Sequence, residues 1–198
     1  MGITNSKLDT RTQLLDAAQK LVQLRSYEGF NFRDLAEAVG IRKASIYHHF
    51  PSKEALTVIM LERTRDRFLA WASINTTAIP LKQLELYCFD LYLERLGAGR
   101  QLCPGGTLAS AWQHMPEHVQ AAARALLFAQ QEFVRAAIER GMDNGSIVNT
   151  KEAAELAEWL VASVQGALVT SRILASVAES GEVIFTRLCH QTLGVISK

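Results

Sequence analysis

Residues 31–55 read N-F-R-D-L-A-E-A-V-G-I-R-K-A-S-I-Y-H-H-F-P-S-K-E-A, and this stretch decides the fold. Apolar residues recur at helical spacing after Asn31, whose side-chain oxygen can accept hydrogen bonds from the first turn of a helix. Gly40 then supplies the left-handed conformation that ends a helix and reverses the chain. We therefore predict a first helix over residues 31–39, followed by a tight turn.

A second short helix is expected at residues 43–50. Ile46 and Phe50 lie four residues apart and should face inward, whereas the other face carries hydrogen-bond donors and planar rings. Pro51 should end this helix, and Ser52 should cap the next. Such a pair predicts a helix-turn-helix that places its second helix in the DNA major groove. The expected DNA-contacting residues are Arg42, Lys43, Ser45, Tyr47, His48, His49 and Lys53.

The segment from Val39 to Leu56, V-G-I-R-K-A-S-I-Y-H-H-F-P-S-K-E-A-L, resembles the signature of the TetR family of bacterial one-component repressors. The resemblance implies an all-helical homodimer with a DNA-binding domain of residues 1–52 and an effector-binding and dimerisation domain of residues 53–198. It also implies a palindromic double-stranded DNA operator that a small-molecule or electrophile effector releases. One departure is Arg42, which stands where the family usually has a Ser or Thr helix cap.

Charge and cysteine content are compatible with such a regulator. The 198 residues carry a net charge of only +1, but residues 1–67 hold eleven Lys and Arg against eight Asp and Glu. This asymmetry is typical of a DNA-binding domain joined to a second domain of nearly neutral charge. Ordinary solvated surface charge produces the same asymmetry. Three cysteines without CxxC spacing, and no secretory leader, predict a reducing, cytoplasmic compartment. We expect no cofactor.

The rest of the chain predicts helices and no strands, which makes the expected fold all-α with about nine helices. A long apolar stretch from Leu156 to Ala175 is interrupted by Glu158, Gln165 and Arg172, so we interpret it as a buried interface helix rather than a membrane span. Besides the two short helices, apolar periodicity indicates helices at 7–24, 52–71, 80–96, 107–113, 116–140, 150–175 and 181–193, with Gly141 ending the fifth of these and Thr150 capping the sixth.

The last two long helices carry a stripe of apolar and small residues. Small residues let helices approach closely, so the stripe predicts the interface of a two-fold dimer, with an intrachain core as the alternative. The candidate interface residues are Trp159, Ser163, Gly166, Thr170, Ile184 and Leu188.

Cys103 is a candidate effector or redox residue, because it precedes an expected helix start at Thr107 and lies near Arg100 in the sequence. Both features favour the thiolate. Its placement is similar to that of the reactive cysteine in electrophile- and hypochlorite-sensing members of the TetR family; an inert, partly buried thiol is the alternative. Aromatic candidates for lining an effector pocket, each of which is equally compatible with plain core, are Phe89, Tyr92, Trp112 and Phe128.

Residues 114–118 read H-M-P-E-H, which matches a metallopeptidase pattern. Zinc chemistry needs both histidines on one helical face, and Pro116 is expected to begin a helix after His114. A zinc hydrolase is therefore a weak alternative, and we do not expect an enzyme. A small-molecule carrier with a vestigial helix-turn-helix is the other alternative, which operator binding would exclude.

Overall fold

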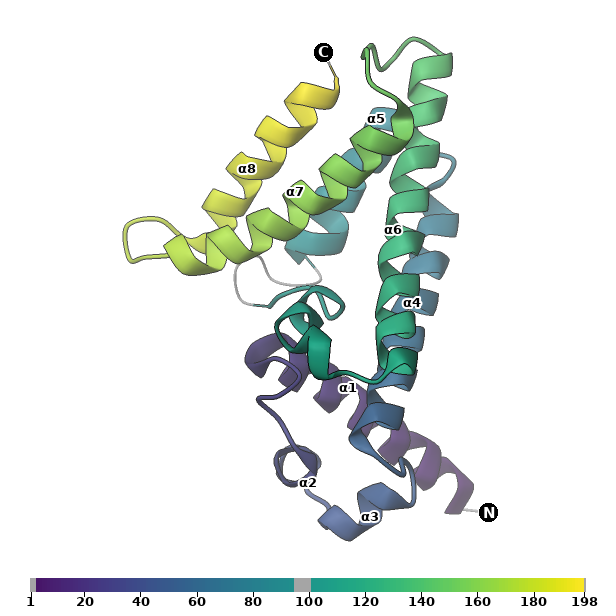
Figure 1. Cartoon of the computed structure of the whole chain (residues 1–198), viewed down its shortest axis with the longest axis vertical. Coiled ribbons are helices and arrows are strands. Elements are labelled where there is room, and N and C mark those ends of the chain that lie inside the picture. The colour runs from purple at the N-terminus through teal and green to yellow at the C-terminus, as the bar shows by residue number, and fades with distance from the viewer. Residues whose placement is uncertain (1–2, 95–100, 198) are drawn as a thin grey trace. The chain divides into compact units, whose positions relative to one another are not determined.

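The computed structural model describes residues 3–94 and 101–197, and within these ranges every regular element is helical (Figure 1). The chain divides into two compact units. Unit 1 comprises Met1–Asp66 and Pro104–Leu126, and unit 2 comprises Arg67–Cys103 and Leu127–Lys198. This division differs from the boundary expected after residue 52, because the start of the next helix and residues 104–126 supply part of the first unit's core.

Unit 1 contains the expected helix-turn-helix. Its elements are α1 (Ile3–Arg25), α2 (Phe32–Val39), α3 (Lys43–Tyr47), the first part of α4 (Lys53–Asn75), the 3₁₀ helix η2 (Gly106–His114) and the start of α6 (Glu117–Asp143). Each presents an apolar side to one core, whose fully buried members include Leu14, Leu35, Ile46, Phe50, Leu56 and Leu108. The helix-turn-helix therefore has a hydrophobic scaffold of its own.

Unit 2 contains the end of α4, α5 (Pro80–Leu86), the π-helix η1 (Tyr87–Glu94), the rest of α6, α7 (Ala153–Leu174) and α8 (Gly181–Ile196). Because α5 continues directly into η1, the described residues form nine helical segments, as predicted. Helices α7 and α8 lie side by side along their length (Figure 1). None of the helices in the described ranges is long and apolar enough to cross a membrane.

Some helix boundaries differ from the prediction. Helix α3 ends at Tyr47 rather than at residue 50, because the chain tightens into i→i+3 bonds before Pro51, from His48 N to Ser45 O (3.3 Å) and from His49 N to Ile46 O (2.9 Å). Helix α1 begins four residues earlier than expected and α4 ends four residues later. Residues 95–96, the expected end of the helix that begins at residue 80, lie outside the described residues.

Two predicted helix ends are wrong. Thr150 does not cap α7, whose N-cap is Glu152, because the Asn149 side chain accepts a hydrogen bond from Lys151 N (3.1 Å) and forms a turn before the helix. Gly141 does not end α6, which continues to Asp143. A Cβ at Gly141 would lie 2.5 Å from Ile147 Cδ1, so glycine serves close packing at this position.

Helix α2 has the capping arrangement that the sequence predicts. Asn31 Oδ1 accepts hydrogen bonds from Arg33 N (2.7 Å) and Asp34 N (3.3 Å), and Asp34 Oδ2 accepts one from Asn31 N (2.8 Å). The N-cap of α3 is Arg42, whose side chain makes no capping hydrogen bond. The first helix of the pair is therefore capped by side chains at its start and the second is not.

We expect Asn31→Ala to lower the free energy of unfolding by about 1 kcal/mol, because it leaves the first amides of α2 without acceptors. Arg42→Ala is the matched control, since it removes an N-cap side chain that forms no cap, and should change stability by less than about 0.5 kcal/mol. Urea titrations followed by circular dichroism measure both. Equal losses in the two variants would contradict the assigned capping box.

Candidate nucleic-acid interface

The turn between α2 and α3 fixes the direction of the second helix. Gly40 adopts a left-handed conformation (φ 74°, ψ 31°), and its N–H donates to Ala36 O. Ile41 N also donates to Ala36 O, at 3.0 Å. Both bonds satisfy the Ala36 carbonyl in the last turn of α2, and the chain turns within two residues. Ile46, fully buried, then anchors α3 in the core, so that the opposite face of the helix is directed to solvent.

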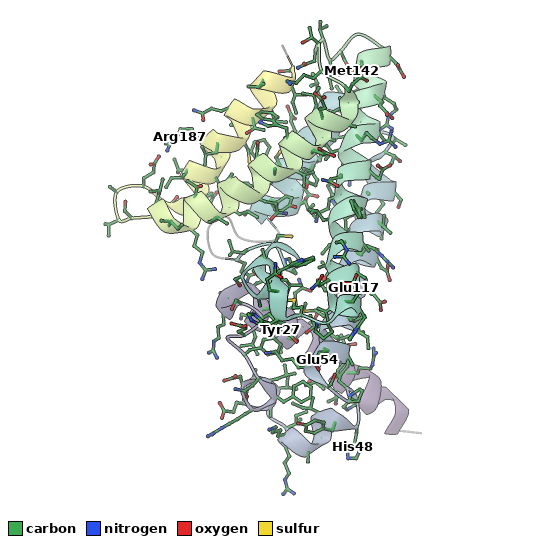
Figure 2. All side chains as sticks on the ribbon, viewed as in Figure 1. Tyr27, His48, Glu54, Glu117, Met142 and Arg187 are labelled. Carbon is green, nitrogen blue, oxygen red and sulfur yellow. The ribbon has the colours of Figure 1, made fainter. Side chains whose placement is uncertain are left out.

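The solvent face of α3 carries most of the predicted DNA-contacting residues. Arg42, Lys43 and His48 are exposed, and Tyr47 is 51% exposed. Figure 2 shows His48 at the end of this helix. The Tyr47 ring packs edge-on against Phe32, with ring centroids 5.2 Å apart, so part of the side chain is held by the scaffold while the rest is accessible. Lysine, arginine and phenol groups of this kind donate to phosphate oxygens and base edges.

Ser45 and His49 are less accessible than this group. Both are half-buried, and the His49 ring lies 6.5 Å from that of Phe50, centroid to centroid. They lie beside the exposed residues and are less accessible to DNA. We define the exposed α3 face as Arg42, Lys43, Tyr47 and His48.

Lys53 is placed differently from the other predicted contacts. Its Nζ donates to Phe30 O (2.7 Å) and lies 4.3 Å and 4.6 Å from the ring centroids of Tyr27 and Phe30. Burial lowers the pKa of Lys53, although Glu54 opposes this effect. The ammonium group therefore joins the start of α4 to the turn before α2. The sequence predicts instead that Lys53 contacts DNA.

Two further residues, Tyr27 and Glu54, lie beside Lys53 and were not predicted from the sequence. Tyr27 Oη donates to Glu54 Oε1 at 3.4 Å, and the two side chains meet in Figure 2. Burial and the nearby Glu54 carboxylate raise the pKa of Tyr27 to about 12. The two residues lie 27 positions apart, so no local pattern in the sequence indicates their contact.

The predicted effector residues do not gather in one place. Cys103 is only 4% exposed and belongs to the unit 2 core, while its expected neighbour Arg100 lies outside the described residues. Tyr92 is also buried in unit 2, whereas Phe128 is 60% exposed. Phe89 stacks against His190 with ring centroids 4.9 Å apart, and Trp112 belongs to unit 1, where Arg124 lies over its ring.

Most of the residues predicted for the dimer interface lie together, unlike the effector candidates. Trp159, Ser163, Thr170 and Leu188 line one groove between α7 and α8. Gly166 is exposed on α7. Ile184 differs from this group, because its side chain is 2% exposed and is therefore covered within the protomer.

The histidines of the H-M-P-E-H segment lie in different helices. His114 is the last residue of η2, and His118 lies in the first turn of α6. Met115 between them is extended (φ −85°, ψ 138°), which separates the two side chains from a shared helical face. Within the described ranges, no three His, Cys, Asp or Glu side chains converge on a possible metal site.

A short helix with an exposed cationic and aromatic face, following a capped helix and a glycine turn, defines a helix-turn-helix protein. Residues 14–58 match the family model described as "Bacterial regulatory proteins, tetR family". The crystal structure of a TetR-family transcriptional regulator from Agrobacterium tumefaciens superposes with a TM-score of 0.85 at 28% identity, over 96% of this chain and 99% of that one. Residues 14–58 therefore match a TetR-family domain, and the chain as a whole has the fold of a TetR-family regulator.

Curated relatives are similar mainly in the DNA-binding region. The repressor KstR2 of Rhodococcus jostii (strain RHA1) is 45% identical over 53 residues, which cover 27% of this chain and 26% of KstR2. The match therefore spans about a quarter of that protein's length. The repressor DhaR of Mycobacterium sp. (strain GP1) is 27% identical over 175 residues, or 85% of each chain.

Proposed function

We propose that this protein is a transcriptional repressor that binds a palindromic DNA operator as a homodimer and leaves it when a small molecule binds. The observation that carries the proposal is the exposed α3 face, which presents two cationic side chains, a phenol and an imidazole on one short helix. A helix of this size fits the major groove, and these groups donate to phosphates and base edges. The names of KstR2 and DhaR, both repressors, support the same proposal.

The homodimer is proposed from the exposed side of α7. Trp159, Ala162, Gly166, Val169 and Ile173 are all exposed there, although four of them are apolar and the fifth is glycine. They follow one another at alternating spacings of three and four residues, which is the spacing of a seam between packed helices. The groove beside this seam adds Leu188 and Val195 from α8. A second copy placed about a two-fold axis would cover both.

Gly166 offers a test of the proposed dimer. A Cβ at this position meets no atom within 4 Å in the protomer, so Gly166→Arg should leave the protomer folded. At a close helix contact the arginine should prevent assembly, and we expect a monomer in light scattering and at least tenfold weaker operator binding. Val148→Arg, at a site that is 66% exposed outside α7 and α8, is the matched control and should remain dimeric. A dimeric Gly166→Arg protein would place the interface elsewhere.

Release of DNA is proposed to follow from ligand binding in unit 2. Helix α4 contributes residues to both units, so the chain offers a continuous helical connection between them. A ligand that favours one of two separations of the paired DNA-binding units shifts the population toward it, in proportion to its difference in affinity for the two.

Binding to the DNA upstream of the protein's own gene tests the proposal. We expect nuclease protection of a palindrome whose half-sites lie about 34 Å apart, or a multiple of that distance, with affinity at least 10³-fold above that for random duplex. Equal affinity for the two duplexes would reject repression and favour the small-molecule carrier. Compounds that lift the protection would then identify the effector class.

A further inference from the structure

Two cysteines face each other inside unit 2. Cys88 lies in η1 and Cys189 in α8, two helices that pack against each other, and both side chains are fully buried in the same hydrophobic core. The residues that follow them, Phe89 and His190, stack with their ring centroids 4.9 Å apart. The two helices therefore cross at the point where each carries a cysteine. We refer to Cys88 and Cys189 as the dithiol pair.

The two thiols are in direct contact. Their hydrogen bond is the main reason that the pKa of Cys88 is raised well above the usual range for a thiol, and burial acts in the same direction. A hydrogen bond raises the pKa of the group that donates it, so Cys88 Sγ–H donates to Cys189 Sγ. Both cysteines are free thiols. The contact therefore aligns two sulfur atoms that share no covalent bond.

A disulfide between these two sulfurs needs no cavity. It adds no atom to the core, and its S–S distance of about 2.05 Å is shorter than a contact between two thiols. Inserting atoms into a close-packed core is destabilising, whereas removing two hydrogens does not overfill it. The two sulfurs have only to approach each other. The core around the dithiol pair is therefore compatible with the oxidised form as well as with the reduced one.

Burial restricts the reagents that reach the dithiol pair. Neither side chain is exposed, so a reagent has to enter during local opening of the core. A bulky reagent needs a wide opening, and a charged reagent loses its hydration in apolar surroundings. Hydrogen peroxide is uncharged and nearly as small as water. The surroundings of the dithiol pair therefore favour a small neutral peroxide over other thiol reagents.

We propose that the dithiol pair is an oxidation site, which a small neutral peroxide converts reversibly to a disulfide between η1 and α8. The inference goes beyond the proposed function, because it requires neither an operator nor an effector. It also differs from the redox role considered for Cys103 in the sequence, since Cys103 takes no part in it.

The oxidation proceeds in two steps. The Cys189 thiolate attacks one oxygen of the peroxide, so that an S–O bond forms, the O–O bond breaks, and the leaving hydroxide takes up the proton that Cys189 released. The Cys88 sulfur then attacks the sulfenic acid of Cys189. An S–S bond forms, the S–O bond breaks, and the second hydroxide takes the Cys88 thiol proton. The two thiols lose two electrons, the two peroxide oxygens gain them, and two waters leave.

Thiol counting after exposure of the full-length protein to hydrogen peroxide tests the proposal. The chain has three cysteines, and we expect the titration in denaturant to fall from three thiols to one and to return to three with dithiothreitol. Peptide mapping by mass spectrometry should find Cys88 joined to Cys189 within one chain. Cys103→Ala is the matched control, because it makes the same change in the same core and should still form this disulfide. Neither Cys88→Ala nor Cys189→Ala should form a disulfide.

The wild-type peptide map decides the proposal even where an alanine variant does not fold. Three thiols remaining after peroxide would overturn it, as would a disulfide that includes Cys103 or that joins two chains. A loss of thiols that dithiothreitol does not reverse would also overturn it, because that loss reports sulfinic or sulfonic acid instead of a disulfide.

Thermal unfolding tests whether the disulfide forms in the folded unit. The bond closes a loop of about 100 residues, so the oxidised protein should melt at least about 4 °C above the same sample after dithiothreitol. Dithiothreitol reduces the disulfide and leaves methionine sulfoxide in place, so the difference in Tm reports the cross-link alone. A Tm that does not rise with the disulfide would mean that the bond forms only in an opened chain, and would reject a site in the native core.

Discussion

Tyr47→Ala is expected to weaken operator binding by about ten- to a hundredfold, because a hydrogen bond to a charged phosphate contributes roughly 1.5 to 3 kcal/mol. Tyr47 is 51% exposed on α3, and its ring is held against Phe32. A phosphate contact does not depend on the base sequence. The affinity for a duplex of scrambled sequence should therefore fall by a similar factor. Fluorescence anisotropy with labelled duplexes at fixed salt measures both losses.

Tyr47→Phe separates the hydroxyl from the ring. It keeps the contact with Phe32 and removes only the donor, so we expect most of the loss to remain. Tyr27→Phe is the matched control, since that hydroxyl bonds to Glu54 within unit 1 and lies off α3. Should Tyr47→Phe bind both duplexes as tightly as the wild type, the phenol does not contact phosphate.

Leu35→Ala is expected to have the largest effect on stability. Its side chain is 0% exposed in the unit 1 core, and removing it leaves a cavity that costs about 2 to 5 kcal/mol. Leu24→Ala makes the same chemical change at a position that is 40% exposed, and should cost less than about 1 kcal/mol. Chemical denaturation followed by circular dichroism gives both values.

The same variant links stability to binding. Loss of unit 1 packing should also lower operator affinity in the Leu35→Ala protein, because α3 is positioned by that core. A Leu35→Ala protein as stable as Leu24→Ala would mean that α2 does not pack as described.

Elements with local signals were predictable from the sequence. Helix α2 begins after Asn31 and ends at Gly40, because a capping side chain and a left-handed glycine act within a few residues of themselves. The start of α8 after Ser180 was predictable for the same reason, as its side chain accepts from Val183 N. Such short-range chemistry is visible in the sequence without knowledge of the fold.

Features that depend on distant residues were not predictable. The inward position of Lys53 depends on Phe30, 23 residues earlier, and the buried hydroxyl of Tyr92 accepts a hydrogen bond from Gln165, 73 residues later. The π-helix from Tyr87 to Glu94 has the apolar pattern of an ordinary helix, so its altered turn was not recognised. The Asn149 turn likewise displaced the expected cap of α7. In each case a tertiary contact or a competing turn decided the outcome.

Methylation protection of guanine N7 tests the central claim most directly, because this atom lies in the major groove where α3 is proposed to bind. We expect two protected patches related by a two-fold axis, about one helical turn or a multiple of it apart. Both patches should be lost with Gly166→Arg at limiting protein concentration. Unprotected N7 atoms within a nuclease footprint, or a single protected patch per bound complex, would contradict it.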